Sequence, residues 1–333
     1  MVSYKGLKGT PEGIKEESYE RAIGPDEVLV KVTHSGLCGT DAHYKDADMV
    51  LGHEGVGVVE QVGDKVTLFK KGDRAGWGYQ RNSCGHCAQC LSGKEVYCPG
   101  QEKEMYGAAN KDLGSMASHA VWKAAFLHAV PDGMESAHAA PLMCGGATVF
   151  TALHDYPVRP TDRVGVVGVG GLGHLAIQFA ARMGCEVVVF SGTESKKDEA
   201  LRLGAREFYA TKDLKDYRDV CKTPVNALLV TTSAQPDWNG YFPILAPEAI
   251  VFPLGLSQGD LKVPYLPFLL KGIRVQGSVV ANRQTHREML RFAAVHKIKP
   301  IIQEFPLTVD GLNKAFDTLG NGKMKYRAVL VAQ

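Results

Sequence analysis

Residues 162–184 read DRVGVVGVGGLGHLAIQFAARMG, and they set the fold class of the chain. A short run of β-branched residues leads into closely spaced glycines, and then into a helix-forming segment that ends at Gly184. A second apolar strand at residues 186–190 and a second helix at residues 196–203 follow. Strands that alternate with helices predict an α/β domain, in which a doubly wound parallel sheet is covered by helices on both faces. Its later strands are expected near residues 227–232, 249–254 and 274–278.

The glycines of this stretch form the pattern G-x-G-x-x-G. Between a strand and a helix, this pattern indicates a dinucleotide site, because glycines allow a tight turn and let a pyrophosphate approach the N–H groups at the start of the helix. The alternative is a glycine-rich turn with a structural role only. We expect the cofactor to contact the whole run of Gly168, Gly170, Gly171, Leu172 and Gly173.

The end of the second strand indicates which dinucleotide binds. An NAD site usually has an acidic residue there, about 20 residues after the glycines, that holds the ribose hydroxyls. This position falls near Gly192, where the acid is absent. Hydroxyl and ammonium groups, which suit a 2′-phosphate, surround it instead: Ser191, Thr193, Ser195, Lys196 and Lys197. NADP is therefore favoured over NAD, with Glu194 expected to face solvent, although the lysines are also what a solvated helix start would show.

The residues before about 140 have a different texture. Residues 27–33 and 55–63 are rich in β-branched residues and are bounded by glycine, proline and aspartate, as strands are. From about residue 284, a helix, a strand near residues 300–305 and a last strand at residues 327–331 follow. We expect this tail to fold back and complete the first domain.

Six of the eight cysteines fall into two patterns typical of zinc sites. The first is a contiguous loop of four thiols: Cys84, Cys87, Cys90 and Cys98. The second is scattered, and it consists of Cys38, His53 with Glu54 after it, and Cys144. Four thiolates close a tetrahedral zinc shell and hold structure, whereas two thiolates and one imidazole leave a position open for chemistry. We therefore expect two zinc ions per chain; disulfides in the loop and a buried structural histidine at 53 are the alternatives.

Composition limits the partners. The 333 residues carry a formal net charge of +2 and are 45% hydrophobic, which is ordinary for a globular protein. This charge gives no electrostatic reason to expect nucleic acid or an anionic membrane as the main partner. The N-terminus is polar, and no apolar run has the length of a membrane span. We expect a cytoplasmic protein with a small-molecule substrate.

Taken together, these motifs resemble the zinc-dependent alcohol dehydrogenases of the medium-chain dehydrogenase/reductase superfamily. The resemblance covers nearly the whole chain and lies in residues 38–43, 52–55, 84–98, 141–148 and 168–173. The last two segments and the turn at 191–200 look most like the cinnamyl-alcohol-dehydrogenase-like subgroup, which uses NADP. The resemblance implies a GroES-like, β-rich catalytic domain formed by residues 1–143 and 283–333, and a Rossmann cofactor domain formed by residues 144–282. It also suggests a homodimer.

The resemblance implies roles for single residues. Cys38, His53 and Cys144 would hold the zinc that binds the substrate oxygen, and Asp41 would hydrogen-bond the other nitrogen of His53. Thr40 would pass the alcohol proton toward His43, although an ordinary turn threonine and a surface histidine are the alternatives. Glu54 would be either a carboxylate beside the ligands or an alternative fourth ligand. Further cofactor contacts are expected at Thr148, Gly255, Ser278 and Arg327.

The leading hypothesis is a zinc-dependent oxidoreductase that interconverts primary alcohols and aldehydes, often aromatic or allylic, with NADP(H). A polyol dehydrogenase is a second possibility because residues 38–44 also look like sorbitol dehydrogenases. A non-catalytic relative that only binds zinc and nucleotide is a third. Tyr79, Met105 and Val279 match positions that line the substrate pocket in relatives, or they pack in the core. The segment between Cys38 and His53 is several residues shorter than is usual, so the substrate cannot be carried over from the family.

Overall fold

The computed structural model describes residues 1–257 and 259–333. It consists of two compact units, one formed by Met1–Ala147 with Val280–Gln333 and the other by Thr148–Val279. Among the described residues, no helix combines the length and the apolar character needed to cross a membrane.

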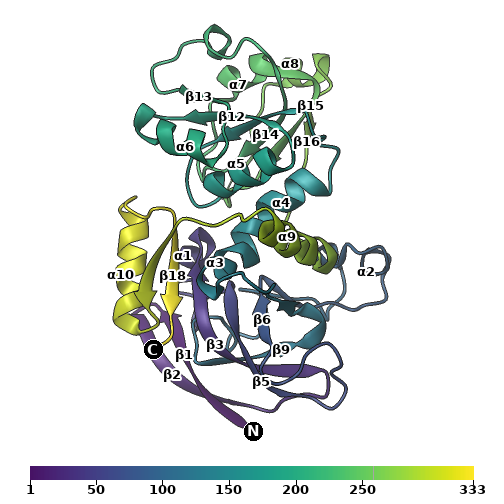
Figure 1. Ribbon diagram of the computed structural model, residues 1–333, viewed down its shortest axis with the longest axis vertical. Helices are drawn as coiled ribbons and strands as arrows, with labels where there is room; N and C mark the ends of the chain where they lie inside the picture. The colour runs from purple at the N-terminus through teal and green to yellow at the C-terminus, as the bar shows by residue number, and fades with distance from the viewer. Residues whose placement is uncertain (258) are drawn as a thin grey trace. The chain divides into compact units, whose positions relative to one another are not determined.

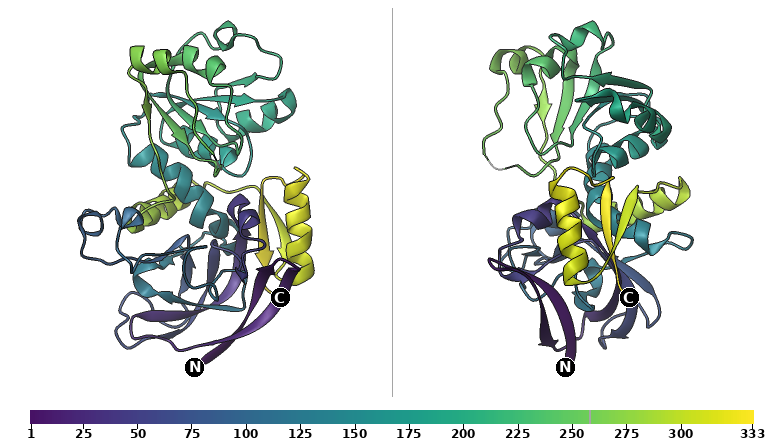
Figure 2. Two further views of the ribbon diagram at one scale, coloured as in Figure 1. Left: turned by 180° about the vertical axis from the view of Figure 1, so that it is seen from behind. Right: turned by 90° about the vertical axis from the view of Figure 1, so that its left-hand side faces the viewer.

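The unit Thr148–Val279 is built on a six-stranded sheet in which every pair is parallel. The strands are β11 (Arg163–Val167), β12 (Glu186–Ser191), β13 (Glu207–Ala210), β14 (Val225–Val230), β15 (Leu245–Pro253) and β16 (Arg274–Val275). The helices are α4 (Ala147–His154), α5 (Gly173–Arg182), η4 (Glu194–Lys196), α6 (Lys197–Leu203), η5 (Tyr217–Asp219), α7 (Trp238–Ile244) and α8 (Tyr265–Leu270). Helices α5 and α6 lie on one face of the sheet, and α7 and α8 lie on the other (Figures 1 and 2).

The spatial order of these strands is β13-β12-β11-β14-β15-β16. The chain leaves β11 to one side and later returns to its other side, so the order reverses there. In open parallel sheets, ligands bind beyond the carboxyl ends of the strands at such a point. The expected doubly wound parallel sheet is confirmed, and the glycine run follows β11 directly.

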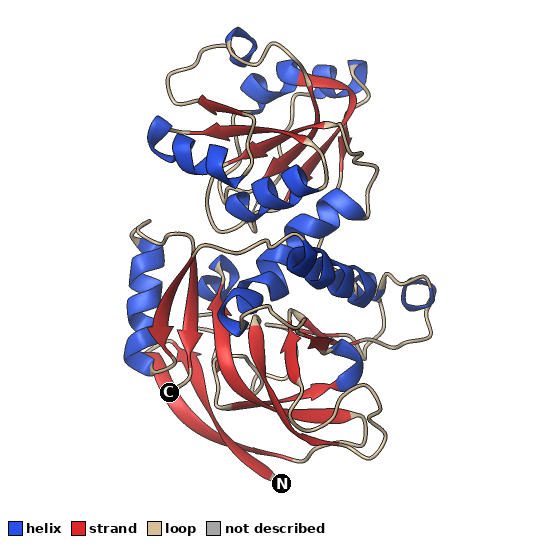
Figure 3. Cartoon of the chain, viewed as in Figure 1, coloured by secondary structure: helices blue, strands red, loops and turns tan. Residues whose placement is uncertain are grey.

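The other unit is mainly antiparallel. Its strands are β1 (Val2–Thr10), β2 (Gly13–Arg21), β3 (Glu27–Leu37), β4 (Met49–Val50), β5 (Gly55–Val62), β6 (Arg74–Trp77), β7 (Gln80–Asn82), β8 (Glu104–Met105), β9 (His119–Lys123), β10 (His128–Ala129), β17 (Ile302–Pro306) and β18 (Arg327–Val331). Its helices are α1 (Gly39–His43), α2 (Ala88–Leu91), η1 (Glu95–Tyr97), η2 (Ala124–Phe126), α3 (Ser136–Pro141), η3 (Leu142–Gly146), α9 (Arg283–Val295) and α10 (Val309–Gly320) (Figure 3).

Strand β3 is the centre of this unit. It pairs with β5, β9 and, through Ala328 opposite Leu37, with β18 from the end of the chain. Strand β18 in turn pairs in parallel with β17. The C-terminal segment thus completes the sheet whose central strand ends just before Cys38.

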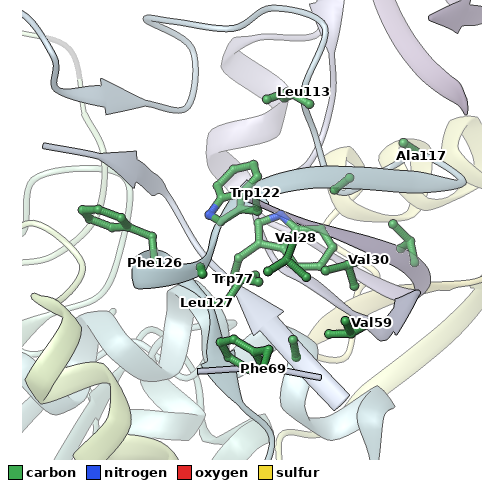
Figure 4. Packing of buried hydrophobic residues seen from close by; sticks show 14 of the residues in the cluster. Val28, Val30, Val59, Phe69, Trp77, Leu113, Ala117, Trp122, Phe126 and Leu127 are labelled. Carbon is green, nitrogen blue, oxygen red and sulfur yellow. The ribbon is translucent and has the colours of Figure 1, made fainter. Parts of the chain in front are cut away.

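Each unit has its own core. In the antiparallel unit, Trp77 and Trp122 pack with ring centroids 5.7 Å apart among valines of β3 and β5 (Figure 4). In the parallel unit, the ring of Phe190 on β12 packs edge-on against the ring of Tyr241 on α7, with ring centroids 5.3 Å apart. These cores hold rigid the strand ends that carry the polar site residues.

Two local features were not predicted from the sequence, and a third differs from its prediction. Strands β1 and β2 form a long hairpin at the start of the chain. The sequence pattern does not indicate it, because β2 is largely exposed and carries many charged residues. The strand expected at residues 274–278 pairs only at Arg274 and Val275. Residues 142–146 form a π-helical turn between α3 and α4, and this turn carries Cys144.

Candidate metal and cofactor sites

Three separate turns bring the scattered metal-ligand candidates together within the antiparallel unit. Cys38 follows β3 with extended backbone and precedes α1, His53 and Glu54 lie between β4 and β5, and Cys144 lies in the π-helical turn. One potential ligand atom from each of these four residues lies within 4.8 Å of the others. The structure therefore forms a cluster from residues that are far apart in the sequence.

Asp41 orients two of the ligand candidates. Its Oδ1 lies 3.0 Å from Nδ1 of His53, and its Oδ2 accepts a hydrogen bond from the backbone N–H of Cys38 at 2.7 Å. The carboxylate favours the tautomer of His53 with the proton on Nδ1, which leaves Nε2 with a lone pair. This Nε2 is buried and has no hydrogen-bond partner in the described part of the chain. A bare imidazole nitrogen beside two thiols fits a zinc ion.

The thiols and the imidazole perturb one another. The hydrogen bond between the two thiols holds the pKa of Cys38 well below its usual range and raises the pKa of Cys144 well above it. Burial alone would lower the pKa of His53, but Asp41 and Cys38 raise it well above its ordinary value. Without metal, the cluster thus retains protons that a divalent cation would replace.

Glu54 and Arg327 form a buried ion pair at the same cluster. Burial raises the pKa of Glu54 to about 7, against the opposing effect of Arg327. The oxygen Oε1 is held by Arg327, while Oε2 is buried and unpartnered within the described residues. Glu54 is therefore held as a carboxylate beside the ligands through Oε1, and its Oε2 is available to a metal ion. Arg327, expected to contact the cofactor, places its guanidinium against Glu54 here.

Thr40 and His43 lie on α1, immediately after Cys38. Thr40 Oγ1 is 3.6 Å from Cys38 Sγ and is partly buried. His43 is the last residue of the helix and is exposed. This short helix therefore leads from the ligand cluster to the surface, as a proton path requires.

The contiguous cysteines form a second cluster around α2. The Sγ atoms of Cys84 and Cys98 are 3.5 Å apart, those of Cys84 and Cys90 are 3.8 Å apart, and those of Cys87 and Cys98 are 3.9 Å apart. Zn–S bonds of about 2.3 Å in a tetrahedron separate the sulfurs by about 3.8 Å. All four residues are free thiols. The spacing therefore fits a closed zinc site.

Two tyrosines enclose His53. Tyr79, an expected pocket residue, packs edge-on against the imidazole with centroids 5.3 Å apart. Tyr106 packs against the same ring at 4.6 Å, and its hydroxyl accepts a hydrogen bond from the N–H of Gly52 at 2.9 Å. Sequence reasoning missed Tyr106, since no spacing marks it. Tyr79 and Met105 line one pocket, and Val279 is 41% exposed.

The glycine run of the parallel unit has the features of a phosphate-binding turn. Gly168 has a φ of +90°, which favours glycine, and a Cβ on Gly173 would lie 2.0 Å from the carbonyl oxygen of Gly168. At Gly170, by contrast, a Cβ would meet nothing within 4 Å. The turn is therefore tight where the chain packs on itself and open where a pyrophosphate can approach the start of α5.

The turn after β12 places its polar groups as follows. Gly192 has open space where a Cβ would stand. Lys196 Nζ donates to the carbonyl oxygen of Val169 in the glycine run at 2.6 Å. Lys197 pairs with the exposed Glu194 at 3.2 Å, and Thr193 hydrogen-bonds Ser195. The lysine that reaches the glycine run is thus Lys196.

The remaining expected cofactor residues are spread over the same unit. Thr148 is buried in α4, and Ser278 has a buried hydroxyl without a partner in the described structure. A Cβ on Gly255 would lie 2.2 Å from the carbonyl oxygen of Thr232, so glycine there lets the loops after β14 and β15 approach closely.

Comparisons with known proteins establish the family. The model of the alcohol dehydrogenase GroES-like domain matches residues 24–132, and that of the zinc-binding dehydrogenases matches residues 171–295. The chain is 33% identical to NADP-dependent alcohol dehydrogenase C 1 of Mycolicibacterium smegmatis, over 99% of this chain and 97% of that protein. It is 34% identical to cinnamyl alcohol dehydrogenase 8 of Arabidopsis thaliana, over 93% and 89% of the two chains.

Solved structures agree. A cinnamyl alcohol dehydrogenase from Sorghum bicolor superimposes with a TM-score of 0.92 at 32% identity, covering 99% of this chain and 98% of that one. A Helicobacter pylori enzyme solved with NADP(H) gives a TM-score of 0.87 at 28% identity, covering 99% and 98%. The chain belongs to the zinc-dependent alcohol dehydrogenases of the medium-chain dehydrogenase/reductase superfamily, so the expected family and the GroES-like plus Rossmann fold are confirmed.

Proposed function

We propose that the chain interconverts primary alcohols and aldehydes, aromatic and allylic ones above all, with NADP(H) as the hydride carrier. One observation carries the proposal: two thiols and an unpartnered imidazole nitrogen converge beside a helix that leads to the surface. Three protein ligands leave a coordination position for substrate, which distinguishes this cluster from the closed four-thiol loop.

Cys38, His53 and Cys144 would hold the catalytic zinc. Bound there, zinc supplies a Lewis acid for the substrate oxygen, and NADP(H) supplies or accepts the hydride. Asp41 keeps the lone pair of His53 Nε2 directed at the metal position. Thr40 Oγ1 would relay the alcohol proton along α1 to the exposed His43, which lies at the surface end of this helix and can pass the proton to solvent.

NADP is supported by what surrounds Gly192. Among the residues between β12 and α6, hydroxyl and ammonium groups outnumber the single carboxylate of Glu194, which is paired with Lys197. Relatives named as NADP-dependent alcohol dehydrogenases and a structure solved with NADP(H) support the same choice. The aromatic and allylic preference is supported by relatives named cinnamyl alcohol dehydrogenase.

A rate comparison on zinc-loaded protein tests the function. NADPH and NADH would each be offered with cinnamaldehyde, benzaldehyde and butanal, and NADP⁺ with sorbitol. We expect aldehyde reduction that is faster with NADPH and is lost in Cys144→Ser. Faster turnover of sorbitol would favour a polyol dehydrogenase. If protein shown to hold both zinc ions oxidised neither cofactor with any aldehyde, the proposal would be overturned in favour of a non-catalytic relative.

We further propose a homodimer formed through α8 and the edge strand β16. Tyr265, Leu266, Leu269 and Leu270 are each more than half exposed on this one helix, and β16 pairs on only one side in the described structure. Exposed apolar patches and open sheet edges favour association. Sedimentation should give a dimer that Leu266→Glu with Leu270→Glu makes monomeric, while Leu201→Glu on α6 does not. A monomeric parent protein would contradict this.

A cytoplasmic location is our proposal as well. The eight cysteines are free thiols in the structure, and six of them lie in clusters that suit a metal rather than a disulfide. Thiol clusters of this kind persist in a reducing compartment. Fractionation of cells that produce the tagged chain would test this, and recovery in a secreted fraction would contradict it.

A further inference from the structure

Two histidines outside both metal clusters form a buried stack. His128 lies on β10 and His286 on α9, and their rings are 3.9 Å apart with an angle of 21° between the planes. Both side chains belong to the same unit, and they are 4% and 3% exposed. The proposed reaction assigns no role to either of them.

Each ring has a nitrogen without a partner. Nδ1 of His128 and Nε2 of His286 are buried and make no hydrogen bond in the described structure. A neutral imidazole offers one donor and one acceptor. Leaving such a buried group without a hydrogen bond is unfavourable, so a small polar group bound at the stack would be stabilised by it.

The stack lines the pocket that also contains Tyr79 and Met105, with Phe126 and Arg283. Tyr79 connects this pocket to the metal site, because the same ring packs on His53. The pocket is narrow, with space for a group about the size of a water molecule. It therefore accepts the end of a substituent rather than a whole ring.

The charge of the pocket defines the substituent. Burial lowers the pKa of His286 to about 3 and holds that of His128 well below its usual value, so both rings are neutral at physiological pH. The positive charge of Arg283 is compensated by the buried Glu95, which accepts hydrogen bonds from its Nε at 2.9 Å and its backbone N–H at 2.7 Å. A neutral group that both donates and accepts fits, whereas a carboxylate or an ammonium is not matched by an opposite charge.

We propose that this pocket receives a hydroxyl group on the part of the substrate remote from the reacting carbon, and that His128 and His286 bind it. The inference rests on the proposed function, since the aldehyde end of the substrate is taken to lie at the zinc site. It makes the two histidines specificity-determining residues for hydroxylated aromatic substrates.

The test compares kcat/KM for benzaldehyde with that for meta- and para-hydroxybenzaldehyde, and for cinnamaldehyde with para-hydroxycinnamaldehyde. For each pair, kcat/KM for the hydroxylated aldehyde is divided by kcat/KM for the plain one. Because intrinsic reactivity affects this ratio equally in every variant, a difference in the ratio between variants reports on binding of the hydroxyl group. His286→Phe keeps an aromatic ring in the stack but removes its hydrogen bonds, His286→Gln keeps a donor and an acceptor, and His154→Gln is the control on the exposed end of α4.

We take the substrate pair for which the parent protein has the highest ratio of kcat/KM for the hydroxylated aldehyde to kcat/KM for the plain one. This ratio is expected to fall about tenfold in His286→Phe, to recover in part in His286→Gln and to stay unchanged in His154→Gln. An equal loss for plain and hydroxylated substrates would mean that the stack is structural or holds only water, and would overturn the proposal. Should His286→Phe not fold, His128→Phe, which removes the hydrogen bonds of the other ring of the stack, should show the same fall in this ratio.

A second measurement separates the pocket from the reaction. Imidazole nitrogen NMR signals of His128 and His286, assigned with the variants, would be followed while para-hydroxybenzyl alcohol or benzyl alcohol is added to zinc-loaded protein with NADP⁺. Shifts with the hydroxylated alcohol alone would support the pocket even if no turnover occurred, in which case the proposed function fails and the subsite stands. The opposite outcome would overturn the subsite and leave the proposed function intact: the protein reduces aldehydes, but the hydroxylated alcohol does not shift the histidine signals selectively and the variants do not change the kcat/KM ratio.

Discussion

Asp41 places its Oδ1 3.0 Å from Nδ1 of His53, and both side chains are fully buried. The second oxygen of this carboxylate holds the backbone of Cys38. One side chain thus fixes two of the three proposed ligands of the open metal site. Its contribution can be measured as metal affinity, separately from any effect on chemistry.

We expect Asp41→Asn to weaken zinc binding at the open site by about 10- to 100-fold, as loss of such partners does at other metal sites. The amide retains only one acceptor for the two donors that Asp41 serves. Chelator competition would measure the affinity. The four-thiol site is the internal control, since it shares no residue with Asp41, and equal loss of both ions would contradict the assignment.

The two clusters should respond differently to cysteine removal. Cys144→Ala is expected to abolish aldehyde reduction while the fold persists, because it removes a ligand of the open site. Cys98→Ala is expected to lower the melting temperature by several degrees, because a closed zinc site contributes to folding directly. Elemental analysis should find one zinc ion per chain in each variant and two in the parent protein. An equal loss of melting temperature in both would rule out this division of roles.

Cofactor choice can be probed at Gly192, where the structure leaves space for a side chain. Gly192→Asp would restore the acid that NAD sites carry at this position. We expect kcat/KM for NADPH to fall at least about tenfold, because the carboxylate repels the 2′-phosphate, while NADH is little affected. Gly320→Asp, at another open glycine, is the matched control. An unchanged NADPH rate would mean that the 2′-phosphate lies elsewhere.

Sequence reasoning succeeded where the interacting residues are close together in the chain. The thiols of Cys84, Cys87, Cys90 and Cys98 lie on one loop, so their spacing alone indicates a shared ion. The strand, glycine run and helix from Arg163 to Arg182 are likewise continuous, and their pattern is specific. Local geometry decides both features, and local geometry is what spacing encodes.

It failed where the partners depend on sheet register. Glu54 and Arg327 are 273 residues apart, and they meet only because β18 pairs with β3 beside β5. The stack of His128 on β10 and His286 on α9 depends in the same way on how two distant elements pack. No periodicity marks such a pair, since each histidine taken alone is an ordinary buried residue.

The buried histidine stack also predicts how stability depends on pH. The pKa of His286 is lowered from its ordinary 6.5 to about 3 by burial, so between these values the unfolded chain binds a proton that the folded chain does not. Stability should therefore fall as pH decreases below about 6.5, by up to about 1.4 kcal/mol per pH unit for each such histidine. His128, whose pKa burial also lowers, should add to this slope.

The free energy of unfolding of His286→Phe and of the parent protein would be measured by urea titration between pH 5 and 6.5. Its slope against pH should be smaller in His286→Phe by up to the contribution of one proton, about 1.4 kcal/mol per pH unit. Zinc loss at acid pH affects both proteins alike and cancels in the difference. An unchanged slope in His286→Phe would contradict this prediction, because it would show that the stack is protonated in the folded state.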